Sequence, residues 1–196
     1  MSDRPARPGG QSTSWSPRLA RVEARTVIRR IEASDGPVVR SVRLRSLATD
    51  PSSFASTHAR EAAFAEDEWT EWAAGDASGE EKSTLLAVRA GEPVGLVAAY
   101  RDAEQESLFH VVAMWVAPEA RREGIGRRLL EEIEGWISSS GGTWAHLSVS
   151  DQALPALHLC DAAGYRLDGE RSKSAHTAGV ALVSLRKELG RPARGS

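Results

Sequence analysis

Two glycines and three arginines stand together between an apolar run and an amphipathic segment. The glycines are Gly124 and Gly126, and the arginines are Arg121, Arg122 and Arg127. Glycine lets backbone amides approach a ligand closely, and the free amides at the start of a helix favour anions. Nearby guanidinium groups add positive charge. These residues therefore predict a cradle for phosphate groups between a strand and a helix.

The spacing of the cradle residues excludes two common nucleotide-binding loops. A Mg-nucleotide P-loop needs Lys and then Ser or Thr after its last glycine, but two arginines follow Gly126. A dinucleotide-binding loop needs a third glycine where this sequence has Leu129. The pattern that fits is Arg/Gln-x-x-Gly-x-Gly/Ala over residues 121–126, with Val116-Ala-Pro118 before it. It resembles the acetyl-CoA pyrophosphate loop of the GNAT superfamily of N-acetyltransferases.

Hydrophobic periodicity and turn residues predict the elements around the cradle. The expected strands cover residues 25–31, 83–90, 92–100, 108–116, 144–149, 165–169 and 178–185. The expected helices cover residues 35–48, part of 61–81, 125–137 and 154–163. This alternation predicts an α/β (α+β) domain. Residues 43–57 also resemble the first helix and following loop of many GNAT proteins. The two resemblances imply a mixed, mostly antiparallel sheet flanked by helices and splayed between its fourth and fifth strands.

Composition limits the class of protein. The chain has 196 residues, 41% hydrophobic and 27% charged, with a net charge of −2. These values predict one soluble domain, and they give no reason to expect a nucleic-acid or membrane partner. We predict a flexible N-terminal extension over residues 1–24, an acetyltransferase domain over 25–189 and a tail over 190–196.

Targeting signals and cysteine content suggest a compartment. The N-terminus has arginines but no apolar core of a secretory signal, and no apolar run is long enough to span a membrane. Cys160 is the single cysteine, so an intramolecular disulfide is impossible. We expect a cytoplasmic protein. The oligomeric state is left open, with a homodimer as one alternative.

The resemblance implies acetyl-CoA as the co-substrate. The residues it assigns to acetyl-CoA are Met114, Val116, Arg121, Arg122, Glu123, Gly124, Ile125, Gly126 and Arg127. Backbone groups around Met114 and Val116 would pair with the pantetheine arm as if it were a further strand. An amide at the same strand end would polarise the thioester carbonyl. We expect no metal ion.

Acetyl transfer to an amine requires that the ammonium ion first lose a proton. Strict alternation places His110 on the same face as Val112 and Met114, which makes it the first candidate base. The alternative is a histidine with a purely structural role. Glu106 on the same strand is a further candidate, as are two glutamates of the acidic segment described below. Water could also carry the proton away.

The second half of the chain departs from the family pattern Asn-x-x-Ala-x-x-Leu-Tyr-x-x-x-Gly-Phe. The matching residues are Ala156, Leu159, Gly164 and Tyr165. Ala153 replaces the usual Asn, and Cys160 replaces the Tyr that often protonates the leaving thiolate. The Cys160 thiol could supply that proton, or it could be a small buried filler. Ser148, Ser150 or water could be the donor instead. Because the family transfers the acetyl group directly, we predict that Cys160 carries no acyl group.

An acidic segment, residues 61–81, allows two interpretations. Glu66, Glu68, Trp69 and Trp72 could form a wall that binds the acceptor, because the first two helices of GNAT proteins commonly border that site. Alternatively, the segment is a surface helix with its tryptophans packed inward.

The sequence thus predicts an N-acetyltransferase that moves an acetyl group to a primary amine, in a ternary complex, with a small cationic molecule as acceptor. A protein N-terminus or a lysine side chain is an alternative acceptor. A different class is also open: Ala153 and Cys160 would suit a catalytically weak domain that senses CoA or binds a partner.

Overall fold

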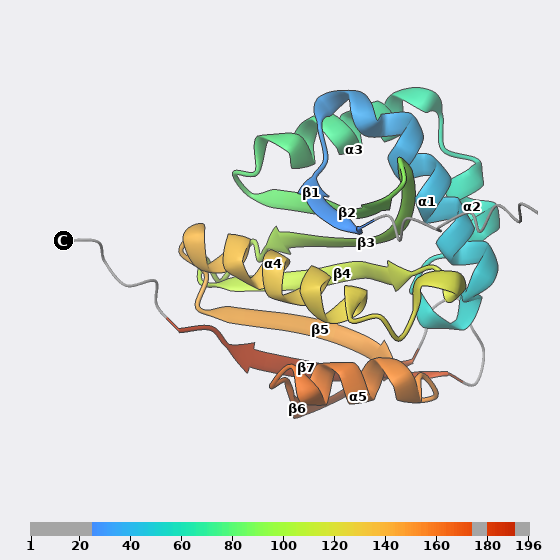
Figure 1. Cartoon of the computed structure of the whole chain (residues 1–196). Helices are drawn as coiled ribbons and strands as arrows, with labels where there is room; N and C mark the ends of the chain where they lie inside the picture. The colour runs from blue at the N-terminus through green and yellow to red at the C-terminus, as the bar shows by residue number, and fades with distance from the viewer. Residues whose placement is uncertain (1–24, 174–179, 191–196) are drawn as a thin grey trace, which may run out of the picture.

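The computed structural model describes residues 25–173 and 180–190. The predicted extension over 1–24, and residues 191–196 of the predicted tail, lie outside this part. The described residues contain one sheet with the order β1-β2-β3-β4-β5-β7-β6 (Figure 1). Its strands are β1 (Val27–Arg30), β2 (Lys82–Arg89), β3 (Glu92–Arg101), β4 (Leu108–Val116), β5 (Trp144–Ser150), β6 (Arg166–Lys173) and β7 (Ala181–Glu188). Neighbours are antiparallel except β4 and β5, which are parallel. The predicted fold class is confirmed.

Five α-helices accompany the sheet in the described residues. They are α1 (Gly36–Thr49), α2 (His58–Ala62), α3 (Glu66–Ser78), α4 (Ile125–Ser139) and α5 (Leu154–Ala162), with short 3-10 turns η1 (Ala33–Asp35), η2 (Pro51–Ser53) and η3 (Pro118–Ala120). The helix α1 ends at Thr49, because the next residue, Asp50, precedes Pro51 and is pushed out of helical geometry.

Neighbouring residues of β4 show that α1 and α4 cover opposite faces of the sheet. Trp115 contacts the C-terminal end of α1: its ring lies 5.6 Å from the Arg45 guanidinium. The side chains of Met114 and Val116 lie beside Gly126, in the first turn of α4. Because successive strand residues point to opposite faces, α1 and α4 lie on opposite sides of β4.

The apolar stripe of α4 forms the centre of the core on its face. Leu129, Ile133 and Ile137 are fully buried there, and the Phe109 ring meets Trp136 edge-on with centroids 5.3 Å apart. Burying each such side chain contributes about 1.5–3 kcal/mol. This packing fixes α4, and with it the cradle, against β4.

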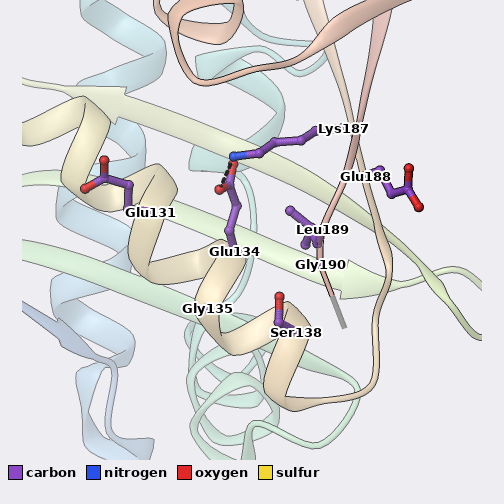
Figure 2. Close-up of a pocket in the computed structure, with 8 residues that line it drawn as sticks. All are labelled: Glu131, Glu134, Gly135, Ser138, Lys187, Glu188, Leu189 and Gly190. Atoms are coloured by element: carbon purple, nitrogen blue, oxygen red, sulfur yellow. Dashed lines mark hydrogen bonds and ion pairs between the residues drawn. The ribbon is translucent and has the colours of Figure 1, made fainter. Parts of the chain in front are cut away.

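A polar contact ties the same helix to β7. Lys187 Nζ lies 2.6 Å from Glu134 Oε2 (Figure 2). The Lys187 ammonium also lies over the Tyr165 ring. Both charged side chains are largely buried, so the pair matters more to packing than a surface ion pair would. The adjoining hollow of about 320 Å³, lined also by Glu131 and Glu188, shares no lining residue with the cleft described below.

The two last strands differ from their predicted bounds. β6 runs over Arg166–Lys173 instead of 165–169, and β7 over Ala181–Glu188 instead of 178–185, of which residues 178 and 179 are outside the described part. β6 is an exposed edge strand whose register with β7 shifts between Leu167 and Arg171. Because β6 has no buried face and contains a bulge, its sequence lacks the alternation of apolar and polar residues that would mark its ends.

Candidate active site

The site begins where two parallel strands separate. β4 and β5 pair only over Leu108–His110 and Trp144–His146. Beyond this short ladder the strands diverge, and a cleft of about 1130 Å³ opens between them. Residues of five segments line it: the end of α1 with the turn after it, Val111–Val116 of β4, η3 with the cradle, Leu147–Val149 of β5, and α5 with the loop before it. The predicted splay between the fourth and fifth strands is confirmed.

A β-bulge in β4 shapes the cleft wall. Leu96 pairs with Trp115 and Ala98 with Val112, so Val97 alone faces both Ala113 and Met114. Ala113 has φ +55°, a left-handed conformation that is uncommon outside glycine. A bulge of this kind interrupts the hydrogen-bond ladder and re-aims the side chains that follow. It therefore leaves backbone groups of β4 facing the cleft.

The bulge corrects one prediction. Strict alternation put His110, Val112 and Met114 on one face, but the extra residue reverses the faces after Val112. Met114 lies beside Gly126 on the α4 side, whereas the His110 ring stacks on Tyr100, on the opposite side from the Phe109 ring. His110 and Met114 are thus on opposite faces.

The cradle has the backbone geometry of an anion site. Arg122 has φ +65° and Gly124 has φ +78°, so two left-handed residues alternate with Glu123. Such alternation turns successive amides toward one point. The amide of Arg128 is bonded to the Gly124 carbonyl, at 3.0 Å, whereas the amides of the three preceding residues have no partner within the helix. These groups fit a pyrophosphate at the N-terminus of α4.

The four charged side chains of the cradle make different contacts. Arg127 pairs with Glu131 on the next turn at 2.7 Å, and Glu123 pairs with Arg89 of β2. Arg121 donates to the Val116 carbonyl at 2.8 Å and pairs with Asp50, which the next paragraph describes. Arg122 lines the cleft and makes no ion pair with another described residue. It is therefore the guanidinium best placed to meet a phosphate.

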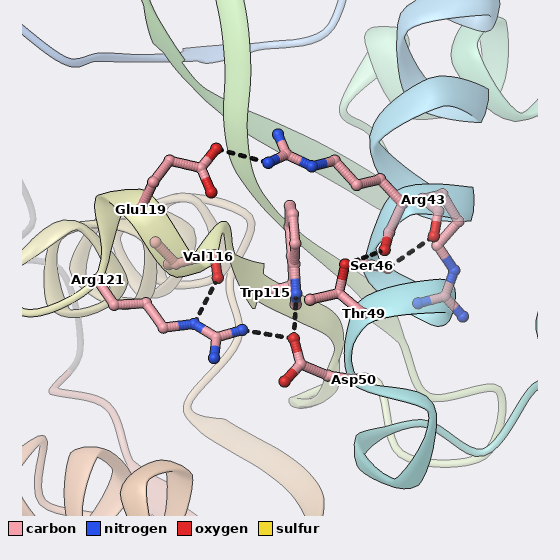
Figure 3. Close-up of polar contacts among 9 residues, drawn as sticks. Arg43, Ser46, Thr49, Asp50, Trp115, Val116, Glu119 and Arg121 are labelled. Atoms are coloured by element: carbon pink, nitrogen blue, oxygen red, sulfur yellow. Dashed lines mark hydrogen bonds and ion pairs between the residues drawn. The ribbon is translucent and has the colours of Figure 1, made fainter.

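Asp50, at the end of α1, joins three parts of the cleft wall (Figure 3). Its Oδ2 accepts a hydrogen bond from Trp115 Nε1 at 2.7 Å and also pairs with Arg121. A second bridge runs close by, from Arg45 to Glu119 at 2.5 Å. The Asp50–Trp115 hydrogen bond and the Arg45–Glu119 ion pair each connect residues more than 60 positions apart in the sequence. They hold the α1 end, the β4 end and η3 together beside the cradle.

A row of polar side chains crosses the sheet on the face opposite α4. We call it the histidine chain; its members, in spatial order, are Asp102, His110, His146, Ser184 and Asp168. The contacts, in the same order, are Oδ2 to Nε2 at 2.7 Å, Nδ1 to Nδ1 at 3.0 Å, Nε2 to Oγ at 2.6 Å and Oγ to Oδ2 at 2.6 Å. Sheet pairing brings the members together, because His110 is the partner of His146 in the parallel ladder.

No member of the histidine chain lines the cleft, but one of them neighbours a residue that does. Ser184 is paired across the sheet with Ser148, which lines the cleft. His110 itself is not part of the lining, and its side chain is 21% exposed. The hydrogen bond from His110 lowers the pKa of Asp102 to about 2. Burial lowers the pKa of His146, and the charge of His110 acts in the same direction.

The comparisons with known proteins agree with this geometry. The sequence model of the Acetyltransferase (GNAT) family matches residues 42–165, well over half of the chain. The chain belongs to this family. It is therefore an N-acetyltransferase that uses acetyl-CoA, as the cradle predicted. A search of curated proteins finds no significant match.

Solved structures share the fold at low sequence identity. A GNAT-family acetyltransferase from Streptococcus pneumoniae is 23% identical, with a TM-score of 0.73 over 85% of this chain and 100% of that chain. A proposed acetyltransferase from Salmonella typhimurium, solved with its cofactor acetyl-CoA, is 12% identical, with a TM-score of 0.71 over 88% and 99% of the two chains. A ribosomal-protein-alanine N-acetyltransferase from Brucella melitensis is 18% identical, with a TM-score of 0.69 over 83% and 99%. Among the helices within residues 25–173 and 180–190, none combines the length and apolarity needed to cross a bilayer.

The remaining catalytic candidates of this acetyltransferase lie in very different surroundings. Cys160 lines the cleft but is 3% exposed, and burial raises the pKa of its thiol to about 11, with the charge of Glu134 adding to the effect. Such a thiol is a weaker acid and forms less thiolate, which fits the small-filler alternative. Glu106 was expected on the central strand, but β4 begins at Leu108 and Glu106 lies exposed in the loop before it. The loop position removes the reason for proposing it as a base.

The predicted acceptor wall does not reach the cleft in the described residues. Trp69 is a core residue, 1% exposed, and it stacks on Trp72 with ring centroids 5.7 Å apart. Trp72 Nε1 donates to Asp76 at 3.1 Å. Glu68 accepts from the Ala65 amide at the start of α3, and Glu66 is exposed in the same turn. The GNAT acetyltransferase thus follows the alternative in which the tryptophans pack inward.

Sequence reasoning missed Asp50, Asp102, His146, Ser184 and Asp168 as a group. Only His146 could have been found from the sequence. It is the third residue of its strand, as His110 is of its own, so two parallel strands whose first residues pair would bring the two imidazoles together. The other four depend on tertiary contacts, from the short Asp102–His110 contact across the β3–β4 turn to the Asp50–Trp115 contact between distant segments.

Proposed function

We propose that this acetyltransferase moves an acetyl group from acetyl-CoA to the primary amine of a small cationic molecule, by direct transfer in a ternary complex. The observation that carries the proposal is the cleft between β4 and β5, which has an anion cradle at its edge. The cleft would hold the thioester of acetyl-CoA from the α4 side of the sheet, while the amine approaches from the opposite side of the sheet.

The residues around the cleft fit acetyl-CoA. The amides at the start of α4 and the Arg122 side chain would bind the pyrophosphate. Backbone groups left unpaired near Ala113 and Met114 would hold the pantetheine arm and donate to the thioester oxygen. Acetyl-CoA supplies an activated acyl group. Everything else, including orientation and removal of the proton, falls to the protein.

The face opposite α4 supports a cationic acceptor. It carries the histidine chain with a carboxylate at each end, Asp102 and Asp168, and both carboxylates have lowered pKa values. For Asp168, burial raises the pKa, but the hydrogen bond from Ser184 and other contacts outweigh it. Carboxylates that stay ionised attract an ammonium ion and favour its approach to the cleft. His110, within this chain, remains our candidate for the group that takes up the amine proton.

A second function has one observation in its favour. Cys160, with a pKa of about 11, stands where the family usually has the Tyr that protonates the leaving thiolate. Ala153 stands where the family usually has Asn. A domain that binds CoA without efficient turnover would tolerate both changes. A protein N-terminus or a lysine side chain also remains an alternative acceptor.

One experiment separates these functions. Calorimetry would measure acetyl-CoA binding, and release of CoA would be followed over polyamines, aminoglycosides, amino acid derivatives, and peptides with a free N-terminus or lysine. We expect micromolar binding and turnover with a small cationic amine, with the acetylated product identified by mass spectrometry. Tight binding without turnover on any acceptor would favour the CoA-sensing alternative, and turnover on peptides alone would favour a protein acceptor.

Kinetics test the direct transfer. Initial rates with both substrates varied should give intersecting lines, because both must be bound at once. Parallel lines, together with an acetylated Cys160, would overturn direct transfer. We further propose that the acetyltransferase domain covers residues 25–189 and that it works in the cytoplasm, where the Cys160 thiol would stay reduced.

A further inference from the structure

The histidine chain contains more contacts than its neutral members can satisfy. It has four contacts of hydrogen-bond length, from 2.6 to 3.0 Å. Each neutral imidazole supplies one N–H, Ser184 supplies one O–H, and an ionised carboxylate supplies none. Three hydrogens are thus available for four hydrogen bonds. With both imidazoles neutral, one short contact brings two lone pairs together.

Adding two protons creates the opposite conflict. If both imidazoles were charged, two N–H groups would face each other across the 3.0 Å Nδ1–Nδ1 contact. Adding one proton removes every conflict, because each contact then has one donor and one acceptor. The geometry therefore fits a pair of imidazoles that together carry a single positive charge between two carboxylates.

We propose that the histidine chain is a proton relay, which takes the proton from the acceptor ammonium ion and passes it to solvent through this singly charged histidine pair. The inference rests on the proposed function, since it names the route by which that reaction loses its proton. It also changes the role of His110, which becomes a relay member acting between His146 and Asp102.

The positions of the two ends give the relay a direction. Asp168 is exposed and bonded to Ser184, whose cross-strand partner Ser148 lines the cleft. Asp102 lies at the other end, in the turn after β3, with its side chain 22% exposed. Asp168 is on the edge strand β6, separated from β5 by β7, so protons would enter at Asp168, at the end of the row Ser148, Ser184, Asp168, and leave at Asp102. The hydrogen-bond contacts of the histidine chain are continuous between Asp168 and Asp102, so the proton needs no water molecule between its members.

The proton balance is complete without another reactant. An N–H bond of the ammonium ion breaks, its electron pair stays on nitrogen, and the proton goes to a carboxylate oxygen of Asp168. The transfer starts from the neutral pair, in which Ser184 donates to His146 Nε2: the Asp168 proton moves to Ser184 Oγ as the Ser184 hydrogen moves to His146 Nε2, which leaves the pair singly charged. One proton then crosses the Nδ1–Nδ1 contact, and His110 passes its Nε2 proton to Asp102, which releases one to water. The amine then forms the new N–C bond as the C–S bond breaks, and the second N–H proton ends on the CoA sulfur. One proton is released per acetyl transfer.

Charged groups around the pair favour one charge rather than two. Glu170 of β6 and the two terminal carboxylates favour protonation, whereas Arg186 of β7 opposes it at His146. The Tyr100 ring of β3 stacks on His110 with centroids 5.0 Å apart. The lowered pKa of His146, caused first by burial, agrees with a pair in which one ring is neutral.

The first test needs no activity. The ring nitrogens of both histidines would be followed by ¹⁵N NMR against pH, with His110→Gln and His146→Gln used for assignment. We expect two coupled steps separated by more than about one pH unit, with both rings at intermediate shifts between the steps. Independent titration of both rings to full charge at a similar pH would overturn the shared proton.

The second test interrupts the histidine chain by removing the Ser184 hydroxyl. Ser184→Ala removes the acceptor of the His146 N–H, so it should lower the first pKa of the pair by about one unit and lower kcat at pH 7 about ten-fold. The rising limb of the kcat/KM profile should move to lower pH by the same amount. Ser184→Thr, which keeps the hydroxyl, should restore both, and Ser172→Ala on exposed β6 should change neither.

The outcomes distinguish the relay from the proposed function. If no amine is acetylated, the proposed function fails, while the NMR titration still decides whether the pair shares one proton. If amines are acetylated and Ser184→Ala keeps the wild-type pH profile and rate, the relay is refuted and the acetyltransferase assignment stands. A loss of rate that follows a loss of folded protein, measured by melting temperature, would refute the relay as well.

Discussion

Asp50 should be needed for the shape of the cleft wall, and replacing it tests this in two steps. Asp50→Ala removes the acceptor of the Trp115 N–H and the partner of Arg121 (Figure 3). Asp50→Asn keeps an oxygen for Trp115 but loses the charge that attracts Arg121. The two variants thus separate the hydrogen bond from the ion pair.

The structure sets the expected magnitudes. Trp115 is 4% exposed, so its unpaired N–H would cost about 1–3 kcal/mol. The Arg121 side chain is 41% exposed, so its ion pair contributes at most about 1 kcal/mol. Asp50→Ala should therefore lose about 1–4 kcal/mol of unfolding free energy, and Asp50→Asn about 1 kcal/mol or less. For a domain of this size, 2 kcal/mol lowers the Tm by roughly 4–8 °C.

Urea unfolding and calorimetric binding of acetyl-CoA would measure both effects. We expect the order wild type, Asn, Ala in stability, and weaker acetyl-CoA binding by the Ala variant because the cradle borders this wall. Equal stability of Asp50→Ala and wild type would refute the reasoning, because it would mean that the Trp115 N–H finds another partner at no cost.

Three further predictions concern other charged or buried groups. Cys160, with a pKa of about 11, should react slowly with iodoacetamide at pH 8 in the folded protein, and rapid alkylation would contradict its burial. Glu61→Ala should cost about 3–5 kcal/mol in urea unfolding, because it leaves the Arg43 guanidinium buried and unpaired; a loss below 1 kcal/mol would contradict this. The folded-state pKa of Asp102 is about 2, below its ordinary 3.8, so its contribution to stability is present above pH 3.8 and is lost as the pH falls toward 2. The stability difference between wild type and Asp102→Asn should therefore shrink over that range, and a constant difference would show that the shift is absent.

The cradle could be predicted from the sequence because its chemistry is local. Residues 121–126 are consecutive, and glycines in the turn before an amphipathic helix favour an anion site whatever the rest of the fold does. The central strand could also be placed, because its apolar run is long. Its bulge could not: Ala113 adopts φ +55° in this fold, and alanine carries no sequence signal for that conformation. That one residue moved Met114 to the other face.

The rest of the site depends on tertiary contacts. His110 was a candidate from its strand position, but its partners come from the ends or interiors of four other segments, and only sheet order and register bring them together. The structure places the acidic segment outside the lining of the cleft, and the sequence could not show this for a related reason. Charge shows that a helix face meets water, but it does not say whether that face borders a cleft.

The central claim is that the cleft between β4 and β5 binds acetyl-CoA through the amides at the start of α4. Gly126→Val tests it, with Gly135→Val as a matched control on the same helix. A Cβ at Gly126 would lie 3.2 Å from the end of the Leu159 side chain, which can yield, whereas a Cβ at Gly135 meets nothing within 4 Å. Both variants carry the same cost in helix propensity, and both should fold.

Calorimetric titration of acetyl-CoA into the two variants and wild type is the deciding measurement. Loss of two amide–phosphate contacts should weaken binding by Gly126→Val at least about 100-fold. Gly135→Val should bind as wild type does. Wild-type affinity in a folded Gly126→Val protein would contradict the assignment of the cradle.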